Sequence, residues 1–235
     1  MGKPVLYFMI ERLKRCKFVD NIVIATTTDK TDDVIIDFAK ENKLDYFRGS
    51  RDDVLDRTYK AAKQFEATIV VRIPSDGVLI DPCIVDTIIK KFILNGSDYT
   101  SNAHPYSYPD GYDVEVINIE ALETAWKNAK EPHEREHVTP YIWENPDKFK
   151  LDNVRYWRNL FFKNRWGLDY KEDFQLIKKV YEALYPKNPH FTMDDILNFL
   201  DKHPKIRGLN KQHLGHMWYN NHIDKLKTIE KRFKK

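Results

Sequence analysis

The segment 5–16 carries the first clear periodic pattern in the chain. Its apolar residues recur at helical spacing, and charged residues occupy the opposite face. The apolar set is Leu6, Met9, Ile10 and Leu13. The pattern predicts a surface helix that packs on a core, with no strand or glycine-rich loop in front of it.

Short β-branched runs alternate with amphipathic segments over the next eighty residues. Strands are predicted at 21–27, 44–49 and 67–73, and helices at 31–42, 51–66 and 82–96. This alternation predicts a doubly wound α/β fold whose mostly parallel sheet is covered by helices on both faces. Ligands of such folds collect beyond the carboxyl ends of the strands. The chemistry is therefore expected in the loops 26–29, 48–53 and 74–82.

The pattern loosens after Gly96 and then resumes. The segment 97–111, SDYTSNAHPYSYPDG, has the prolines and the PDG turn of a loop that could fold over a site. Further strands are predicted at 113–118, 149–157 and 160–169, and further helices at 120–130, 172–185 and 192–203. We interpret residues 1–185 as one α/β domain and residues 186–235 as a helical C-terminal appendage.

Composition excludes several classes of protein. The two cysteines, Cys16 and Cys83, have no CxxC spacing, which favours a reducing cytoplasm over a disulfide scaffold or a sulfur metal site. A net charge of +3 from 39 basic and 36 acidic residues gives no reason to expect a nucleic-acid partner. No run approaches about 18 apolar residues, so no membrane span is expected. The basic end, KLKTIEKRFKK, is interpreted as a solvated helix end or frayed terminus.

Two aspartates at predicted strand ends are candidates for metal chemistry. Asp76 follows the β-branched strand 67–73, and Asp169 ends the predicted strand 160–169. Two carboxylates from distant strand ends could bracket one Mg²⁺ and neutralise phosphate charge. A turn or helix-capping role is the alternative interpretation for Asp76.

Other charged residues near these strand ends have simpler interpretations. Asp81 directly precedes Pro82 and is expected to cap a helix. Glu172 and Asp173 supply the negative charge that favours a first helical turn. Arg165 could reach a phosphate, but an arginine at a strand end is usually solvated, and that is the interpretation we favour.

Four ordered blocks carry a family resemblance: VVRIPSDGVLIDP, PDGYDVEV, EREHVTPYI and RWGLDYKEDFQLI. Together they resemble the cytidylyltransferase family of spore coat polysaccharide biosynthesis proteins. That family is related to the 3-deoxy-manno-octulosonate and acylneuraminate cytidylyltransferases. The resemblance runs from Gly2 to about Tyr185.

The resemblance implies a fold, a reaction and a set of site residues. The fold is a Rossmann-like nucleotidyltransferase fold of the nucleotide-diphospho-sugar transferase type. The donor is CTP, the cofactor is Mg²⁺, and a hydroxyl of a sugar or sugar acid attacks the α-phosphate and releases pyrophosphate. Asp76 and Asp169 correspond to the metal-binding aspartates, with Arg72 and Ser75 flanking the first. The segment beside the nucleotide base supplies Gly49, Ser50, Asp53 and Arg57, and the acceptor pocket supplies Asp113, Glu115, Glu136 and His137.

In the resembling family, Gly-Lys-Pro closes a long phosphate-binding loop after the first strand. Here only Gly2, Lys3 and Pro4 match it, so Gly2 and Lys3 are the expected triphosphate contacts, with Lys3 counted among the catalytic residues. A strand and loop of roughly fifteen to twenty residues would precede them on the βα pattern. We therefore expect either a chain truncated at its N-terminus or a degenerate copy.

The sequence leaves the exact activity and assembly open. The first hypothesis is an enzyme that makes a CMP-activated sugar for a surface polysaccharide. The alternatives are an impaired nucleotide- or sugar-binding remnant and a glycosyltransferase that uses a nucleotide sugar. Phosphoryl-type transfer depends on positioning and charge neutralisation, so no covalent intermediate is expected. His137 could orient the acceptor, act as a base, or be structural. Relatives commonly dimerise, which makes a homodimer a candidate assembly, with the strand 113–118 as the first place for its interface.

Overall fold

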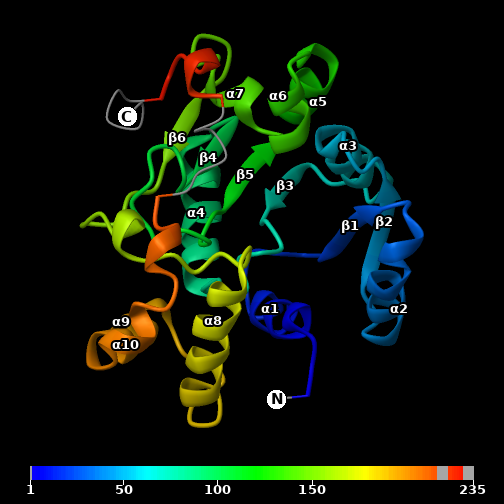
Figure 1. Ribbon diagram of the computed structural model, residues 1–235. Helices are drawn as coiled ribbons and strands as arrows, with labels where there is room; N and C mark the ends of the chain where they lie inside the picture. Colours follow the sequence, from blue (N-terminus) through cyan, green and yellow to red (C-terminus); the bar gives the residue numbers. More distant parts are fainter. Residues whose placement is uncertain (1, 216–221, 230–235) are drawn as a thin grey trace.

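The computed structural model describes residues 2–215 and 222–229 (Figure 1). Its strands are β1 (Val23–Thr27), β2 (Asp45–Gly49), β3 (Ile69–Arg72), β4 (Tyr99–Ser101), β5 (Glu115–Asn118) and β6 (Leu151–Asn153). Its helices are α1 (Val5–Leu13), α2 (Asp33–Glu41), α3 (Val54–Gln64), α4 (Pro82–Asn95), α5 (Ile119–Asn128), α6 (Pro132–His137), α7 (Pro140–Trp143), α8 (Lys171–Leu184), α9 (Met193–Lys202) and α10 (Pro204–Arg207). The alternation of strands and helices predicted up to residue 96 is present.

The described strands form two hydrogen-bonded sheets. β1 pairs in parallel with β2, and a second sheet has the order β3-β5-β4-β6. In the second sheet β5 runs antiparallel to β3 and β4, whereas β4 and β6 are parallel. Three of its four strands therefore run in one direction, so the mostly parallel α/β sheet is confirmed, with β5 as a reversed strand.

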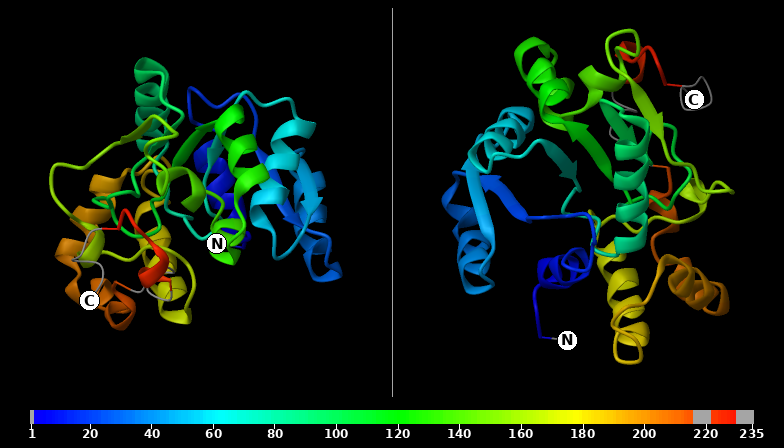
Figure 2. Two further views of the ribbon diagram at one scale, coloured as in Figure 1. Left: turned by 90° about the horizontal axis from the view of Figure 1, so that it is seen from above. Right: turned by 180° about the vertical axis from the view of Figure 1, so that it is seen from behind.

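Helices cover both faces of the four-stranded sheet (Figure 2). Successive side chains of a strand point to opposite faces. Val116 of β5 belongs to a core formed with α1, α4, α8 and α9, and Ile117 belongs to a second core formed with α3, α5 and α7. β5 is paired along both edges and buried, so this strand itself offers no free edge to a second copy of the chain.

The prediction of a loop over the segment 97–111 was wrong in part. Tyr99–Ser101 form β4, which lies between β5 and β6 with all three residues buried. Two of the three residues of β4, Thr100 and Ser101, are polar, and the strand is too short to show a periodic pattern. Four other residues of the segment, Ala103, His104, Tyr106 and Asp110, line a pocket, in line with the predicted position over a site.

The predicted strand 160–169 was also wrong. A short 3₁₀ helix lies at Phe161–Lys163, and only an isolated bridge joins Arg165 to Asp110. The amide of Trp166 donates to Asp110 O (2.7 Å) and that of Leu168 donates to Asp76 O (3.1 Å). The segment thus bonds to two different loops, and this prevents a continuous ladder.

The start of α4 explains how the loop after β3 is anchored. The Asp81 carboxylate accepts from the amide of Cys83 (2.9 Å), and Pro82 takes the first helical position. The helix ends at Gly96, whose φ of +55° is the left-handed conformation that favours glycine. Asp81 also accepts from the amide of Met193 (2.9 Å), at the start of α9. The capping role predicted for Asp81 is therefore present, and it also joins α4 to α9.

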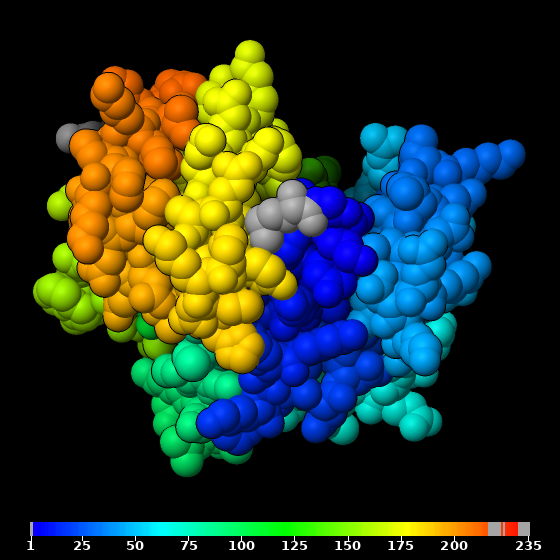
Figure 3. Space-filling model, turned by 90° about the horizontal axis from the view of Figure 1, so that it is seen from below, coloured from blue at the N-terminus to red at the C-terminus, as the bar shows by residue number. Residues whose placement is uncertain are grey.

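Arg12 connects α1 to two distant segments. The residue is only 2% exposed, and its guanidinium donates to Ile80 O (2.6 Å) and Phe191 O (2.9 Å). Figure 3 shows the N-terminal segment in dark blue beside α8 in yellow. Phe8 of α1, Leu176 of α8 and Ile196 of α9 share one core. Residues on both sides of position 185 therefore contribute to the same hydrophobic cluster.

Among the described residues, no helix combines the length and the apolar composition needed to cross a membrane.

Candidate active site

A pocket of about 320 Å³ opens at the carboxyl end of β3. It gathers six of the residues singled out from the sequence, which come from segments far apart in the chain. These are Arg72, Asp76, Asp113, Glu115, His137 and Asp169. The pocket is also lined by Pro74, Ala103, His104, Tyr106, Asp110, Thr139, Phe161 and Arg165.

Three loops cross closely on one side of this pocket. Asp76 lies in a tight turn in which the Gly77 amide donates to Pro74 O (3.1 Å). A Cβ on Gly111, where φ is +90°, would lie 2.2 Å from the Gly167 nitrogen. A Cβ on Gly167 would lie 3.0 Å from the Asp76 carboxylate. The two glycines are therefore required for the crossing, which brings the turn of Asp76 next to the segment that carries Asp169.

The two candidate metal ligands face the same space. Burial raises the pKa of Asp76, and the nearby negative charge of Asp169 raises it further. A cation between the two carboxylates would relieve this repulsion. In the part of the chain that the structure describes, no group of three or more metal-ligating side chains is present. Mg²⁺ commonly takes one or two carboxylates and completes its shell with water and phosphate oxygens, so the pair of aspartates fits that ion.

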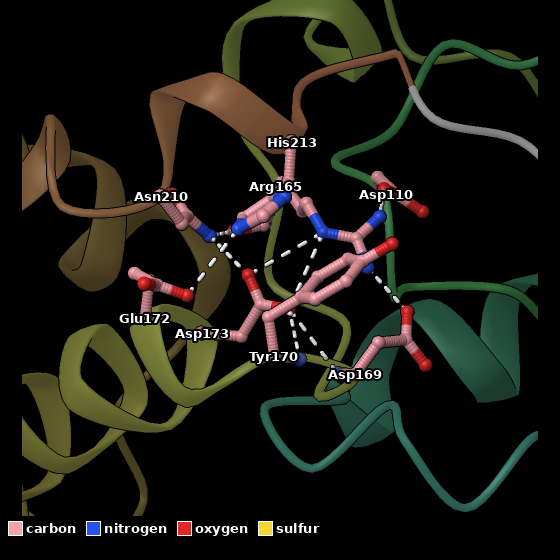
Figure 4. A network of polar contacts seen from close by, with 8 residues as sticks. All are labelled: Asp110, Arg165, Asp169, Tyr170, Glu172, Asp173, Asn210 and His213. Carbon is pink, nitrogen blue, oxygen red and sulfur yellow. Dashed lines mark hydrogen bonds and ion pairs between the residues drawn. The ribbon is translucent and has the colours of Figure 1, made fainter.

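Arg165 is the centre of a buried ion-pair network (Figure 4). Its side chain is 4% exposed, and its guanidinium pairs with Asp110 (2.7 Å), with Asp169 and with Asp173 (3.4 Å). The prediction that Arg165 is solvated was therefore wrong. Asp110 lies 55 positions earlier in the chain, so this partner could not be identified from local sequence patterns.

The pKa of Asp110 in this network is higher than that of an ordinary aspartate. Burial raises it to about 6, assisted by the charges of Asp76 and Asp169 and opposed by Arg165. The pocket therefore concentrates more negative charge than its arginines compensate, which is the electrostatic condition for binding a cation.

Asp173 combines a helix-start role with a second one. It is fully buried and accepts from the amides of Asp169 (3.1 Å) and Tyr170 (3.0 Å) at the start of α8. The helix-start interpretation predicted for Asp173 is therefore right. In addition, its carboxylate holds the backbone on which Asp169 stands.

Glu115 also lines the pocket, and both of its carboxylate oxygens have partners. One oxygen accepts from Tyr99 (2.7 Å) and Thr139 (2.5 Å), and the other pairs with Arg72. Burial would raise the pKa of Glu115, but Arg72 and these hydrogen bonds outweigh it, and the pKa is lowered. The carboxylate is thus charged, and its structural effect is to orient Arg72 toward the pocket.

Two histidines, His104 and His137, also line the pocket. Burial lowers the pKa of His104 to about 4, and this ring stacks on Trp143 with centroids 4.4 Å apart. Burial and the charge of Arg72 lower the pKa of His137 to about 4. Both rings are therefore neutral at pH 7, where they can donate or accept a hydrogen bond but are weak bases.

Asp113 is a pocket residue whose carboxyl group has a raised pKa. Burial raises its pKa well above the ordinary value, and the charges of Asp110, Asp76 and Glu115 add to the effect. A carboxyl group with a raised pKa is better matched to accepting a proton near neutral pH than an ordinary aspartate is.

The remaining predicted residues do not line this pocket. Glu136 and Ser75 are exposed. The Lys3 ammonium lies over the Tyr7 ring, 5.1 Å from its centroid, and Gly2 precedes it with φ of +69°. Their predicted contacts with phosphate and sugar stay predictions.

The predicted base-side residues lie at the end of β2 and the start of α3. Asp53 caps α3 through the Asp56 amide (2.9 Å) and pairs with Arg135 of α6 (2.5 Å). Arg57 donates to Ser50 O (2.7 Å), and a Cβ on Gly49 would lie 2.9 Å from the Arg57 side chain. These residues are bonded within their own segment and do not line the Asp76–Asp169 pocket.

Sequence reasoning missed Asp110, His104 and Thr139. Asp110 and Thr139 lie inside the blocks PDGYDVEV and EREHVTPYI, but the first was interpreted only as part of a turn and the second was not singled out. His104 had no periodic or motif signal. Tertiary contacts bring these residues to the pocket, such as the hydrogen bond from Thr139 to Glu115 of β5.

Comparison with known proteins adds independent findings. A family model described as Cytidylyltransferase matches residues 1–215. An uncharacterized protein of Methanocaldococcus jannaschii is 38% identical over 208 residues, which cover 88% of this chain and 83% of that protein. The spore coat polysaccharide biosynthesis protein SpsF of Bacillus subtilis is 28% identical over 206 residues, covering 85% and 84%. A solved cytidylyltransferase structure from Leptospira borgpetersenii matches with a TM-score of 0.83 and 33% identity, over 88% of this chain and 86% of that chain.

Proposed function

The chain belongs to the cytidylyltransferase family, and we propose that it transfers CMP from CTP to a hydroxyl of a sugar or sugar acid. The family resemblance read from the four sequence blocks is confirmed, and the chain is a cytidylyltransferase-type nucleotidyltransferase. The similarity to a spore coat polysaccharide biosynthesis protein supports a role in making a surface polysaccharide.

The convergence of Asp76 and Asp169 on one pocket carries the proposal. They come from segments more than ninety positions apart, and the charge of Asp169 helps to raise the pKa of Asp76. We propose that they hold Mg²⁺, which would supply charge neutralisation for the triphosphate. Arg165 fixes the Asp169 carboxylate, and Gly111 and Gly167 allow the close approach of the two segments.

The reaction needs one bond made and one broken. The acceptor oxygen attacks the α-phosphorus of CTP, the bond between the α-phosphorus and its bridging oxygen breaks, and pyrophosphate leaves. The proton of the acceptor hydroxyl needs a base, and we propose the Asp113 carboxylate, which lines the pocket and whose ionised form a cation held by Asp76 and Asp169 would favour. His137 is a weak base with a pKa of about 4, so its proposed role is to orient the acceptor through a neutral hydrogen bond.

Arg72 provides positive charge toward the same space. Its guanidinium is held by an ion pair with Glu115, which lines the same pocket. An arginine fixed in this way costs no reorganisation when charge develops on the transferring phosphoryl group. Positioning and charge neutralisation, with no covalent intermediate, are sufficient for this chemistry.

The test is pyrophosphate release from CTP and Mg²⁺ with a panel of sugar acids and neutral sugars. We expect release with at least one acceptor, a CMP-sugar product by ³¹P NMR, and little release with ATP, GTP or UTP. CTP binding by calorimetry with no turnover across the panel would favour a binding remnant. Consumption of a nucleotide sugar without free CTP would favour a glycosyltransferase. Either result would contradict the proposal.

A further inference from the structure

Residues 207–213, which begin at the last residue of α10, run back to the edge of the pocket, and we name them the return segment. The segment contributes Asn210 and His213 to the network around Arg165 (Figure 4). Arg207 also donates to Asn164 Oδ1 (3.3 Å), directly before Arg165. The return segment therefore contacts both ends of the turn that carries Asp169.

Asn210 is the buried part of this contact. The residue is 2% exposed, and its Nδ2 donates to Asp173 Oδ1 (2.7 Å) and to Arg165 O (2.8 Å). The side-chain amide of Asn210 thus links Arg165, which precedes the turn of Asp169, to Asp173, which follows it. Because both acceptors are buried, loss of this donor would leave them unsatisfied.

The second oxygen of Asp173 completes a chain of contacts. It accepts from the amides of Asp169 and Tyr170, and Arg165 Nε approaches the same carboxylate. Asn210 therefore orients the carboxylate that fixes the backbone of Asp169. Asn210 itself does not line the pocket.

His213 covers the same turn from outside. Its ring stacks on Tyr170 with centroids 3.8 Å apart and an interplanar angle of 6°, and its Nε2 lies 3.3 Å from the Glu172 carboxylate. Tyr170 is the residue directly after Asp169, so this stack restrains the turn on its solvent side.

We infer that the return segment is a positioning element of the active site, in which Asn210 holds Asp169 and Arg165 in the geometry that binds the metal. This inference rests on the proposed function, in which Asp169 is a metal ligand. Outer contacts of this kind typically contribute about 10- to 100-fold to metal affinity when they are removed.

The experiment compares wild type with Asn210→Ala. Mn²⁺ binding without nucleotide, followed by electron paramagnetic resonance, should weaken by about 10- to 100-fold. The Mg²⁺ concentration for half-maximal activity should rise by a similar factor, while KM for CTP at saturating Mg²⁺ changes less than about twofold, as expected when ground-state CTP binding is retained. Hydrogen exchange at the amides of Asp169 and Tyr170 should accelerate.

Asn118→Ala is the matched control. Asn118 likewise makes two side-chain bonds, one to the Ala121 amide (2.7 Å) and one to Asp98 (2.8 Å), and it does not line the pocket. It should lower thermal stability without changing Mn²⁺ affinity. If Asn210→Ala does not fold, His213→Ala is the milder variant, with an expected weakening of about 2- to 10-fold from the lost ring stack.

The outcomes distinguish a failure of the proposed function from a failure of the inference about the return segment. Wild type that binds Mn²⁺ but transfers no CMP would contradict the proposed function, whereas the effect of Asn210→Ala on Mn²⁺ affinity and amide exchange could still be measured. Folded variants with unchanged Mn²⁺ affinity, Mg²⁺ dependence and amide protection would overturn the inference. A loss of stability equal to that of Asn118→Ala, with no other change, would leave Asn210 a purely structural residue and would also overturn it.

Discussion

The two sheets differ in how deeply their residues and ion pairs are buried. In the four-stranded sheet, β4 is fully buried and the carboxylate of Glu115 is bound on both oxygens. In the two-stranded sheet, β1 has one buried residue and β2 has none, and the Arg48–Asp33 ion pair is 30% and 56% exposed. Loss of a partner is costly for a buried charge, whereas water can replace the partner of an exposed one.

The largest expected effect is on activity, at the pocket of the four-stranded sheet. Asp76→Asn should lower kcat by about 10²- to 10³-fold, because it removes a proposed ligand of the Mg²⁺ that would stabilise charge on the transferring phosphoryl group. It should also raise the thermal midpoint of the metal-free protein, because burial and Asp169 make the charged Asp76 carboxylate unfavourable. Steady-state kinetics and calorimetry measure the two effects. The exposed Asp20→Asn is the control, and a fall in both activity and stability of Asp76→Asn would assign this residue a structural role instead.

The next effect is on stability, in a pair of ion-pair variants. Glu115→Ala should lower the free energy of unfolding by about 3–5 kcal/mol, because it leaves Arg72 without its buried partner. Asp33→Ala in the two-stranded sheet should cost at most about 1 kcal/mol, because its pair with Arg48 is exposed. Urea unfolding measures both. Equal losses would remove the contrast between the sheets.

The third effect is a pH dependence that comes from the pocket histidines. His104 and His137 have pKa values of about 4 in the folded protein, against 6.5 for an ordinary histidine. Between pH 6.5 and 4 the unfolded chain therefore binds more protons, and the free energy of unfolding falls as the pH falls. The loss should be on the order of 1–3 kcal/mol for each histidine.

The measurement is urea unfolding at several pH values in His104→Gln and His137→Gln. Each variant should show a shallower loss of stability than wild type between pH 6.5 and 4. His190 is exposed, so His190→Gln should follow the wild-type curve. Parallel curves for all four proteins would contradict the buried, neutral state of the pocket histidines.

The smallest expected effect tests the predicted base-side segment. Ser50→Ala should raise KM for CTP by about 3- to 10-fold with kcat unchanged, which corresponds to one neutral hydrogen bond of ~0.5–1.5 kcal/mol. Its hydroxyl also accepts from the Asp53 amide (3.0 Å), so fraying of α3 must be checked by circular dichroism. An unchanged KM in a folded variant would restrict the nucleotide site to the four-stranded sheet.

Much of the fold was predictable because local signals agree with tertiary structure. The helices α1 to α5, α8 and α9 follow apolar periodicity, and Asp81 with Pro82 marked the start of α4 correctly. β4 could not be predicted, because its three residues become a strand only through pairing with β5 and β6. The antiparallel direction of β5 could not be predicted either, because it is defined only by the pairing of β5 with β3 and β4.

The site was predictable where residues stand beside a recognisable strand end or block. Asp76 and Asp169 were placed on one pocket from sequence, although the strand expected before Asp169 is absent. Arg165 and Asp110 were not, because their pairing spans 55 positions and depends on two glycines that let the loops cross. Buried ion pairs are tertiary features, and single-sequence patterns contain no direct record of them.

Arg12 has a consequence for the order in which the chain folds. Its two acceptors lie 68 and 179 positions further along the chain. Closing such a long loop is entropically costly, and contacts at large sequence separation form slowly. During synthesis α1 is made early, and the Arg12 guanidinium gains its second acceptor only after Phe191 has been made. Docking of α1 is therefore completed late, when most of the described chain already exists.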